Sequence, residues 1–161
     1  MKKYLFLLIG VALISQSCIN DDCDNCYNPP AAFGFTLLPA EGETSLIPAK
    51  YKLDTISLYY YDGIVKKEVD LRYGTSNYLG VYLVSTDISV VSASKSIKKF
   101  YLYLNQDDTD TIHFSCKVVN DGCCTNYSYD SISYNGKKML YHQSSGLLYV
   151  IKPQTTLPPV K

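Results

Sequence analysis

The stretch that decides the fold is Thr111–Val119, which reads TIHFSCKVV. Apolar and polar side chains alternate along it, with Ile112, Phe114, Cys116 and Val118 on one face and His113, Ser115 and Lys117 on the other. This period of two is typical of a β-strand that buries one face. Asn120-Asp121-Gly122 follows, and such a tripeptide favours a hairpin turn. The stretch therefore predicts one half of an antiparallel hairpin.

Similar strand-forming segments lie on both sides of this stretch. They are rich in Tyr, Leu, Ile and Val and recur about every ten residues, at 33–37, 51–61, 78–84, 97–104, 129–134, 137–141 and 147–151. Asn135-Gly136 between two of them favours a type I′ turn, because both residue types tolerate a positive φ. No segment after Cys18 carries a clear helical period. The pattern predicts an all-β fold, an antiparallel β-sandwich of eight or nine short strands with an immunoglobulin- or transthyretin-like outline.

Composition agrees with one small folded domain. The chain has 161 residues, 47% of them hydrophobic and 13% aromatic, which excludes a mainly disordered chain. Its 15 basic and 15 acidic side chains cancel, so no nucleic-acid partner is expected, since binding phosphates requires a clustered basic surface.

The N-terminus has the layout of a secretory signal. Met1-Lys2-Lys3 is cationic, and the apolar run 4–14 after it is shorter than the roughly 20 residues that span a bilayer. A buried N-terminal helix is the alternative, but the run has neither an amphipathic period nor a cap. We therefore divide the chain into a signal peptide (1–17), a tether (18–32), a β-sandwich domain (33–152) and a Pro-rich tail (153–161).

Ser15-Gln16-Ser17-Cys18 resembles a bacterial lipobox, and Ile19-Asn20-Asp21-Asp22 resembles the acidic signal that exports lipoproteins of Bacteroidota to the cell surface. This resemblance implies that Cys18 is acylated and that Asp21 and Asp22 direct export. Further elements (Cys26-Tyr27-Asn28-Pro29-Pro30, Phe33-x-Phe35, Asp110-Thr111-Ile112, Cys123-Cys124) are similar to those of small Bacteroidota lipoproteins of unknown function. Such lipoproteins are often accessory parts of larger outer-membrane assemblies.

Five cysteines remain besides Cys18, namely Cys23, Cys26, Cys116, Cys123 and Cys124. An odd number permits at most two disulfides, in a compartment where disulfides persist. A bridge from Cys23 or Cys26 to the 116–124 segment would close a loop of roughly ninety residues, worth about 4 kcal/mol in the chain-entropy model. A redox dithiol at Cys23-Asp24-Asn25-Cys26 and a zinc site of Cys23, Cys26, Cys123 and Cys124 are alternatives. The sequence leaves the connectivity open.

Three tripeptides match the Asp-Ser/Thr-apolar acceptor for O-glycosylation in Bacteroidota, which makes Thr55, Thr111 and Ser131 candidate sites. Each tripeptide is also an ordinary way to begin a strand. The acidic loop 105–110 could supply oxygen ligands to calcium, but it lacks the Gly and the distal Glu of an EF-hand and is expected to be a plain turn. No metal site is therefore expected.

The two histidines, His113 and His142, carry no hydrolase, metalloprotease or P-loop motif with them. We therefore expect neither an enzyme nor a cofactor. The 16 Tyr residues suit either strands or a contact surface. The expected function is that of a non-enzymatic lipoprotein, anchored in the outer membrane by lipid and exposed at the cell surface, which contacts an outer-membrane protein. The alternative is a glycan- or small-ligand-binding module with Tyr as its platform.

Overall fold

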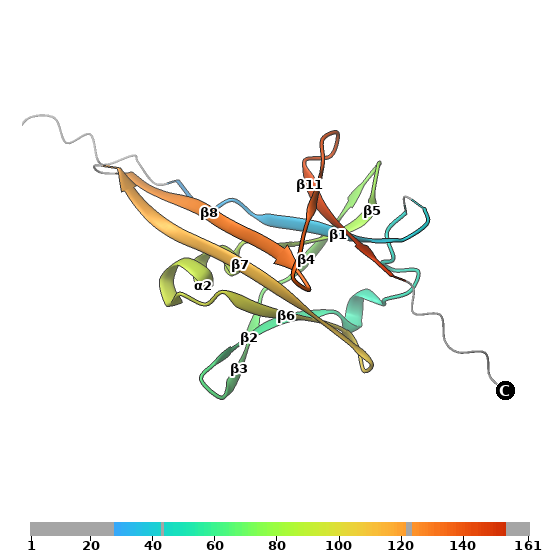
Figure 1. The fold of residues 1–161 in the computed structure, drawn as a ribbon, viewed down its shortest axis with the longest axis horizontal. Helices are drawn as coiled ribbons and strands as arrows, with labels where there is room; N and C mark the ends of the chain where they lie inside the picture. The colour runs from blue at the N-terminus through green and yellow to red at the C-terminus, as the bar shows by residue number, and fades with distance from the viewer. Residues whose placement is uncertain (1–27, 43, 122–123, 154–161) are drawn as a thin grey trace, which may run out of the picture.

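Two β-sheets face each other in the computed structural model, which describes residues 28–153 except 43 and 122–123 (Figure 1). One sheet has five strands in the order β10-β11-β1-β5-β4, and the other has six in the order β3-β2-β6-β7-β8-β9. The predicted all-β sandwich is confirmed. The elements are β1 (Phe33–Pro39), a 3-10 turn η2 (Leu53–Thr55), β2 (Ser57–Asp62), β3 (Val65–Val69), β4 (Arg72–Ser76), β5 (Gly80–Ser85), α2 (Asp87–Lys95), β6 (Lys99–Asn105), β7 (Asp108–Asp121), β8 (Cys124–Tyr134), β9 (Lys137–Lys138), β10 (Leu140–His142) and β11 (Leu147–Lys152).

The core lies between the sheets and is built from alternate residues of the central strands. In β6, for example, Phe100, Leu102 and Leu104 are fully buried, while the residues between them are partly exposed. Phe33, Phe35 and Phe114 interlock, with ring centroids 5.1 Å and 5.0 Å from Phe33. Such burial stabilises a domain by roughly 1.5–3 kcal/mol per large apolar side chain.

One strand pair runs parallel, which the expectation of a purely antiparallel sandwich did not include. β1 pairs with β11 in parallel register, Leu37 opposite Val150 and Leu38 opposite Ile151. The two strands come from opposite ends of the domain sequence, so no local turn restricts their relative direction.

The helix α2 was also not expected from the sequence. Its core-facing residues include Ser89 and Ser92 beside Ile88, so the buried face is too polar to show a hydrophobic period. The hydroxyl of Ser92 donates to the carbonyl of Phe114 at 3.1 Å and accepts from the amide of Cys116 at 3.0 Å. The helix thus satisfies backbone groups of β7 where β6 no longer pairs with it.

The alternation in the deciding stretch is confirmed only as far as Phe114, because Ser115, predicted on the polar face, is buried as well. Ile112, Phe114 and Cys116 are buried, whereas Val118 is 42% exposed. Beyond Phe114 the β7–β8 hairpin extends past the rest of the six-stranded sheet (Figure 1). A bulge at Ser115/Cys116, where Asp130 of β8 has no opposite residue, marks the start of this extension. We call residues 117–121 and 124–129 the hairpin arm.

The Asn135-Gly136 turn also forms as expected. Asn135 has φ 47° and Gly136 φ 74°, and the turn joins β8 to the short β9. The segment 51–61 is a strand only from Ser57, since Tyr51 lies buried in the preceding loop. β3 and β4 were not predicted, because most of their residues are charged or polar and exposed.

Candidate functional site

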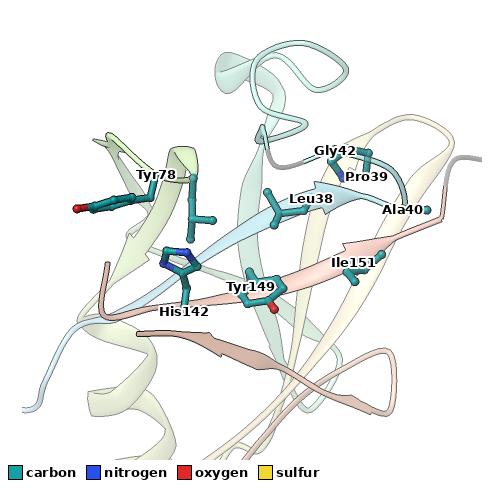
Figure 2. Close-up of a pocket in the computed structure, with 9 residues that line it drawn as sticks. Leu38, Pro39, Ala40, Gly42, Tyr78, His142, Tyr149 and Ile151 are labelled. Atoms are coloured by element: carbon teal, nitrogen blue, oxygen red, sulfur yellow. The ribbon is translucent and has the colours of Figure 1, made fainter. Parts of the chain in front are cut away.

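A hollow of about 250 Å³ opens on the outer face of the five-stranded sheet (Figure 2). Tyr78, His142 and Tyr149 supply its aromatic and imidazole groups, and Leu38 and Ile151 supply apolar surface. The loop 39–42 and the turn before β5 form its rim. The lining residues are Leu38, Pro39, Ala40, Gly42, Tyr78, Leu79, His142, Tyr149 and Ile151.

The strand register explains why these side chains meet. Tyr149 and Ile151 are two residues apart on β11 and therefore point to the same face, and Leu38 lies opposite Ile151 on β1. The turn that carries Tyr78 is held by Ser76, whose hydroxyl accepts from the Tyr78 amide at 3.2 Å. Glycine at position 42 is required by its φ of 111°, which other residues rarely adopt.

His142 is oriented by the turn that follows it. Its Nδ1 lies 3.0 Å from the Ser145 hydroxyl and accepts from the Ser145 amide at 3.3 Å. In the neutral ring this assigns the proton to Nε2, which becomes a hydrogen-bond donor. The Tyr78 ring lies 5.8 Å from the imidazole and the Tyr149 ring 6.5 Å. The hollow thus offers aromatic faces, a ring N–H and two phenol groups to a small ligand.

A second exposed surface lies on the outer face of the six-stranded sheet. Tyr59, Tyr61 and Tyr101, here called the tyrosine cluster, pack with ring centroids 5.3–5.8 Å apart. Lys66 Nζ lies 4.1 Å from the Tyr59 ring centroid, and Lys99 Nζ lies 5.2 Å from that of Tyr101. Burial raises the pKa of Tyr59, and the neighbouring tyrosines add to the rise. As expected, Tyr60 takes the opposite face and is buried.

A buried ion network closes one end of the sandwich. Lys152 Nζ on β11 donates to Asp108 Oδ1 at 2.7 Å and also to Asp110, both on β7. Tyr51 donates to Asp108 at 2.6 Å, and Tyr134 donates to Asp110. Because each of these carboxylates has several donors, the network binds strand to strand and leaves little capacity for an outside ligand.

The network shifts the pKa values of Asp108, Tyr51 and Tyr134. Burial by itself would raise the pKa of Asp108, but hydrogen bonds from Lys152 and Tyr51 outweigh it and the net pKa is lowered. Burial raises the pKa of Tyr51 and of Tyr134, and the adjacent carboxylates raise both further. At neutral pH both phenols are therefore protonated donors. The acidic loop 105–110 thus contributes two paired carboxylates to the interior.

Of the cysteines considered above, the structure describes only Cys116 and Cys124. Cys116 is a buried free thiol, and burial raises its pKa. Cys124 is disulfide-bonded. The other residues named at the N-terminus and in the hairpin turn (Cys18, Asp21, Asp22, Cys23, Cys26 and Cys123) lie outside the described residues.

The three candidate glycosylation residues lie in different surroundings. Thr55 is exposed, but its hydroxyl donates to the carbonyls of Lys52 and Leu104. Thr111 is half-buried opposite Tyr101, directly after the buried Asp110. Ser131 is exposed on β8, with its hydroxyl 3.5 Å from His113 Nδ1. Ser131 therefore has the most accessible hydroxyl of the three.

Sequence reasoning missed the hollow because its residues come from four separate elements. Tyr149 lies in a predicted strand, but nothing in the sequence indicates that Tyr78 and His142 lie beside it. Two Ser–His contacts exist, His113 with Ser131 and His142 with Ser145, and within the described ranges no carboxylate hydrogen-bonds to either imidazole. No cluster of three or more His, Cys, Asp or Glu able to hold a metal occurs in the part of the chain that the structure describes.

None of the helices in the described part of the chain is long and apolar enough to cross a membrane. Comparison with protein-family models, with curated proteins and with solved structures found no match to this chain.

Proposed function

We propose that this protein is a non-enzymatic lipoprotein of the outer membrane, anchored through Cys18 and exposed at the cell surface, that serves as an accessory or interaction subunit of an outer-membrane protein complex. The anchor and export signals of the sequence support the location. The hairpin arm is the single observation that carries the interaction role.

The hairpin arm has the properties of a contact element. Val118 and Val119 are 42% and 41% exposed, so both faces of the arm present apolar surface. No described strand pairs with the β7 edge beyond Phe114, and Ser92 bonds the backbone there only as far as the Cys116 amide, so the edge beyond Cys116 leaves backbone donors and acceptors for another chain. A two-stranded ribbon is only marginally stable by itself. Packing against a partner would both cover the valines and stabilise the ribbon.

The described start of the chain lies against the same arm. The side chain of Asn28 donates to that of Asn126 at 2.7 Å, and the Tyr129 hydroxyl donates to the carbonyl of Ala31 at 2.9 Å. The ten residues from Cys18 to Asn28 reach at most about 35 Å. With Cys18 in lipid, the arm is therefore held close to the membrane, where an outer-membrane partner would meet it.

Affinity purification of the full-length protein tests the proposal. A C-terminal tag, mild detergent and mass spectrometry should recover a stoichiometric outer-membrane protein. Val119→Asp should reduce that recovery at least tenfold, because it places a charge on the contact surface. Ile64→Asp is the matched control, since Ile64 is 97% exposed in the β2–β3 turn and lies outside the arm. Recovery of the protein alone would contradict the proposal.

The hollow favours a second candidate function, the binding of a glycan or another small ligand. Tyr78 and Tyr149 offer ring faces on which a sugar can stack, and their hydroxyls make no hydrogen bond within the described residues. Glycan-array screening followed by thermal shift tests this, because a ligand that binds the native state raises the melting temperature. Tyr149→Ala should abolish the shift, whereas Tyr73→Ala, which removes an exposed tyrosine outside the hollow, should preserve it.

A further inference from the structure

Two lysines lie against the tyrosine cluster on the outer face of the six-stranded sheet. Lys66 is opposite Tyr61 on the neighbouring strand, and its Nζ lies 4.1 Å from the Tyr59 ring centroid. Lys99 precedes Tyr101 by two residues on β6, and its Nζ lies 5.2 Å from that ring centroid. Within the described residues neither ammonium group forms an ion pair. Both are therefore available to an anion.

The strand register brings a third lysine to the same face. Lys99 is opposite His113 on β7, His113 is opposite Ser133 on β8, and Ser133 is opposite Lys138 on β9. Side chains of directly opposite residues point to the same face of a sheet. We call Lys66, Lys99 and Lys138 together with the tyrosine cluster the lysine–tyrosine face.

Positive charge predominates on this face. Glu68, opposite Tyr59, adds one carboxylate to it, against the three lysines. Lys117 and Asp130 lie further toward the hairpin arm and form an ion pair at 3.1 Å, so they add no net charge. The carboxylates of the ion network point to the other side of the sheet, toward Lys152. The lysine–tyrosine face is therefore complementary to an anionic partner.

The spacing of the lysines indicates how densely the partner is charged. Neighbouring strands lie about 4.8 Å apart, so Lys66 and Lys99 are about 10 Å apart, and Lys99 and Lys138 about 14 Å. A strand of nucleic acid carries a charge about every 3.4 Å. The lysines instead match a polymer whose negative charges are more widely spaced.

The groups between the lysines suit a sugar chain. The Tyr61 side chain is 46% exposed and offers a ring on which a sugar can stack. The hydroxyl groups of Thr111 and Ser133 and the imidazole of His113 can form hydrogen bonds with sugar hydroxyls. The large apolar side chains of β6 point into the core, so this strand offers none for insertion into a lipid surface.

We propose that the lysine–tyrosine face binds an acidic polysaccharide. Its carboxylate or sulfate groups pair with the lysines, and a sugar ring between them stacks on Tyr61. This surface is separate from both the hairpin arm and the hollow, so the proposal does not depend on the proposed function.

Binding of the full-length protein, in mild detergent, to immobilised polygalacturonate and dextran sulfate tests the proposal. At low salt the protein should bind an acidic polymer, and neutral dextran should not displace it. Binding should weaken as salt is added, because salt screens exposed charges. Binding to neither acidic polymer, or displacement by neutral dextran, would overturn the proposal.

Paired lysine substitutions test whether the face itself is responsible. Lys66→Gln and Lys138→Gln should each weaken binding about three- to fivefold, the effect of losing one exposed ion pair. Lys67→Gln and Lys137→Gln are the matched controls, because each removes the same charge from the adjacent position, which points to the other side of its strand. Equal losses in the controls would show attraction by net charge alone and would overturn the proposal.

Other anions decide the class of partner. Polyglutamate, oligothymidylate and phosphatidylglycerol micelles, each at equal charge concentration, should displace the protein less effectively than the free acidic polysaccharide. Tyr61→Ala should weaken binding at every salt concentration, because stacking on the ring involves no ionic group. Equal displacement by one of these anions would assign the face to an acidic peptide, a nucleic acid or a membrane, and unchanged binding by Tyr61→Ala would likewise overturn the choice of a polysaccharide.

Discussion

The ammonium group of Lys152 on β11 lies 2.7 Å from the carboxylate of Asp108 on β7, and so joins the last strand of one sheet to a central strand of the other. The Lys152 side chain is only 10% exposed, and Asp110, its second acceptor, is 8% exposed. These ion pairs are therefore largely shielded from water, and removing one partner of such a pair lowers the free energy of unfolding substantially.

Lys152→Met should destabilise the domain strongly. It removes the cation and leaves the buried Asp110 and the partly exposed Asp108 without it, and breaking a buried pair in this way costs about 3–5 kcal/mol. Denaturant unfolding measures the loss. Lys117→Met is the control, because it breaks the exposed pair of Lys117 with Asp130 and should cost less than about 1 kcal/mol. Equal losses in the two variants would show that the network contributes no more than a surface ion pair.

Stability should fall in acid because of Asp108. Its folded-state pKa is lowered, so its contribution is fully present above the unfolded pKa of about 4 and is lost as the pH falls through the folded value. The free energy of unfolding, measured between pH 2 and pH 6, should decline more steeply in the unaltered protein than in Asp108→Asn. Parallel pH profiles would refute this role for the carboxylate.

Ser92→Ala should loosen the contact between α2 and β7. It leaves the carbonyl of Phe114 and the amide of Cys116 without the hydroxyl that now bonds both, at a cost of about 2–3 kcal/mol. Hydrogen exchange of the Cys116 amide should accelerate together with the loss in unfolding free energy. Ser94→Ala removes only an exposed hydroxyl bonded within the helix and should change stability by less than about 0.5 kcal/mol.

The hairpin arm should open more readily than the body of the sheet. The amides of residues 117–119 are expected to exchange faster than those of Tyr101–Tyr103, which lie between two paired strands. Addition of a purified outer-membrane partner should slow exchange in the arm and leave β6 unchanged. Slow exchange in the arm of the isolated protein would show that the ribbon needs no partner.

Local signals predicted the fold well wherever one residue pattern decided an element. The burial of Ile112, Phe114 and Cys116 and the turn at Asn135-Gly136 are both confirmed, although Ser115 is buried as well. The helix α2 escaped prediction because Ser89 and Ser92 occupy buried positions that the pattern treats as exposed. The parallel pairing of β1 with β11 depends on tertiary packing between distant segments.

Less of the candidate site than of the fold could be predicted from the sequence. The tyrosine cluster could be anticipated, since Tyr59 and Tyr61 lie two residues apart on a predicted strand. The hollow could not, because the strand register of β1, β10 and β11 and the turn before β5 together bring His142, Tyr149 and Tyr78 to one place. Asp108 and Asp110 were assigned to a plain loop because their partner, Lys152, is 44 and 42 residues away in sequence.

The parallel pairing of β1 and β11 determines how the domain bears mechanical tension. The described chain enters at the beginning of β1 and leaves at the end of β11, so the two ends lie at opposite ends of the pair (Figure 1). A pull between a fixed N-terminus and a load at the C-terminus would slide the two strands along each other. All of their hydrogen bonds would then have to break together instead of one after another. The parallel pair is therefore arranged to resist a force that pulls the start of β1 away from the end of β11.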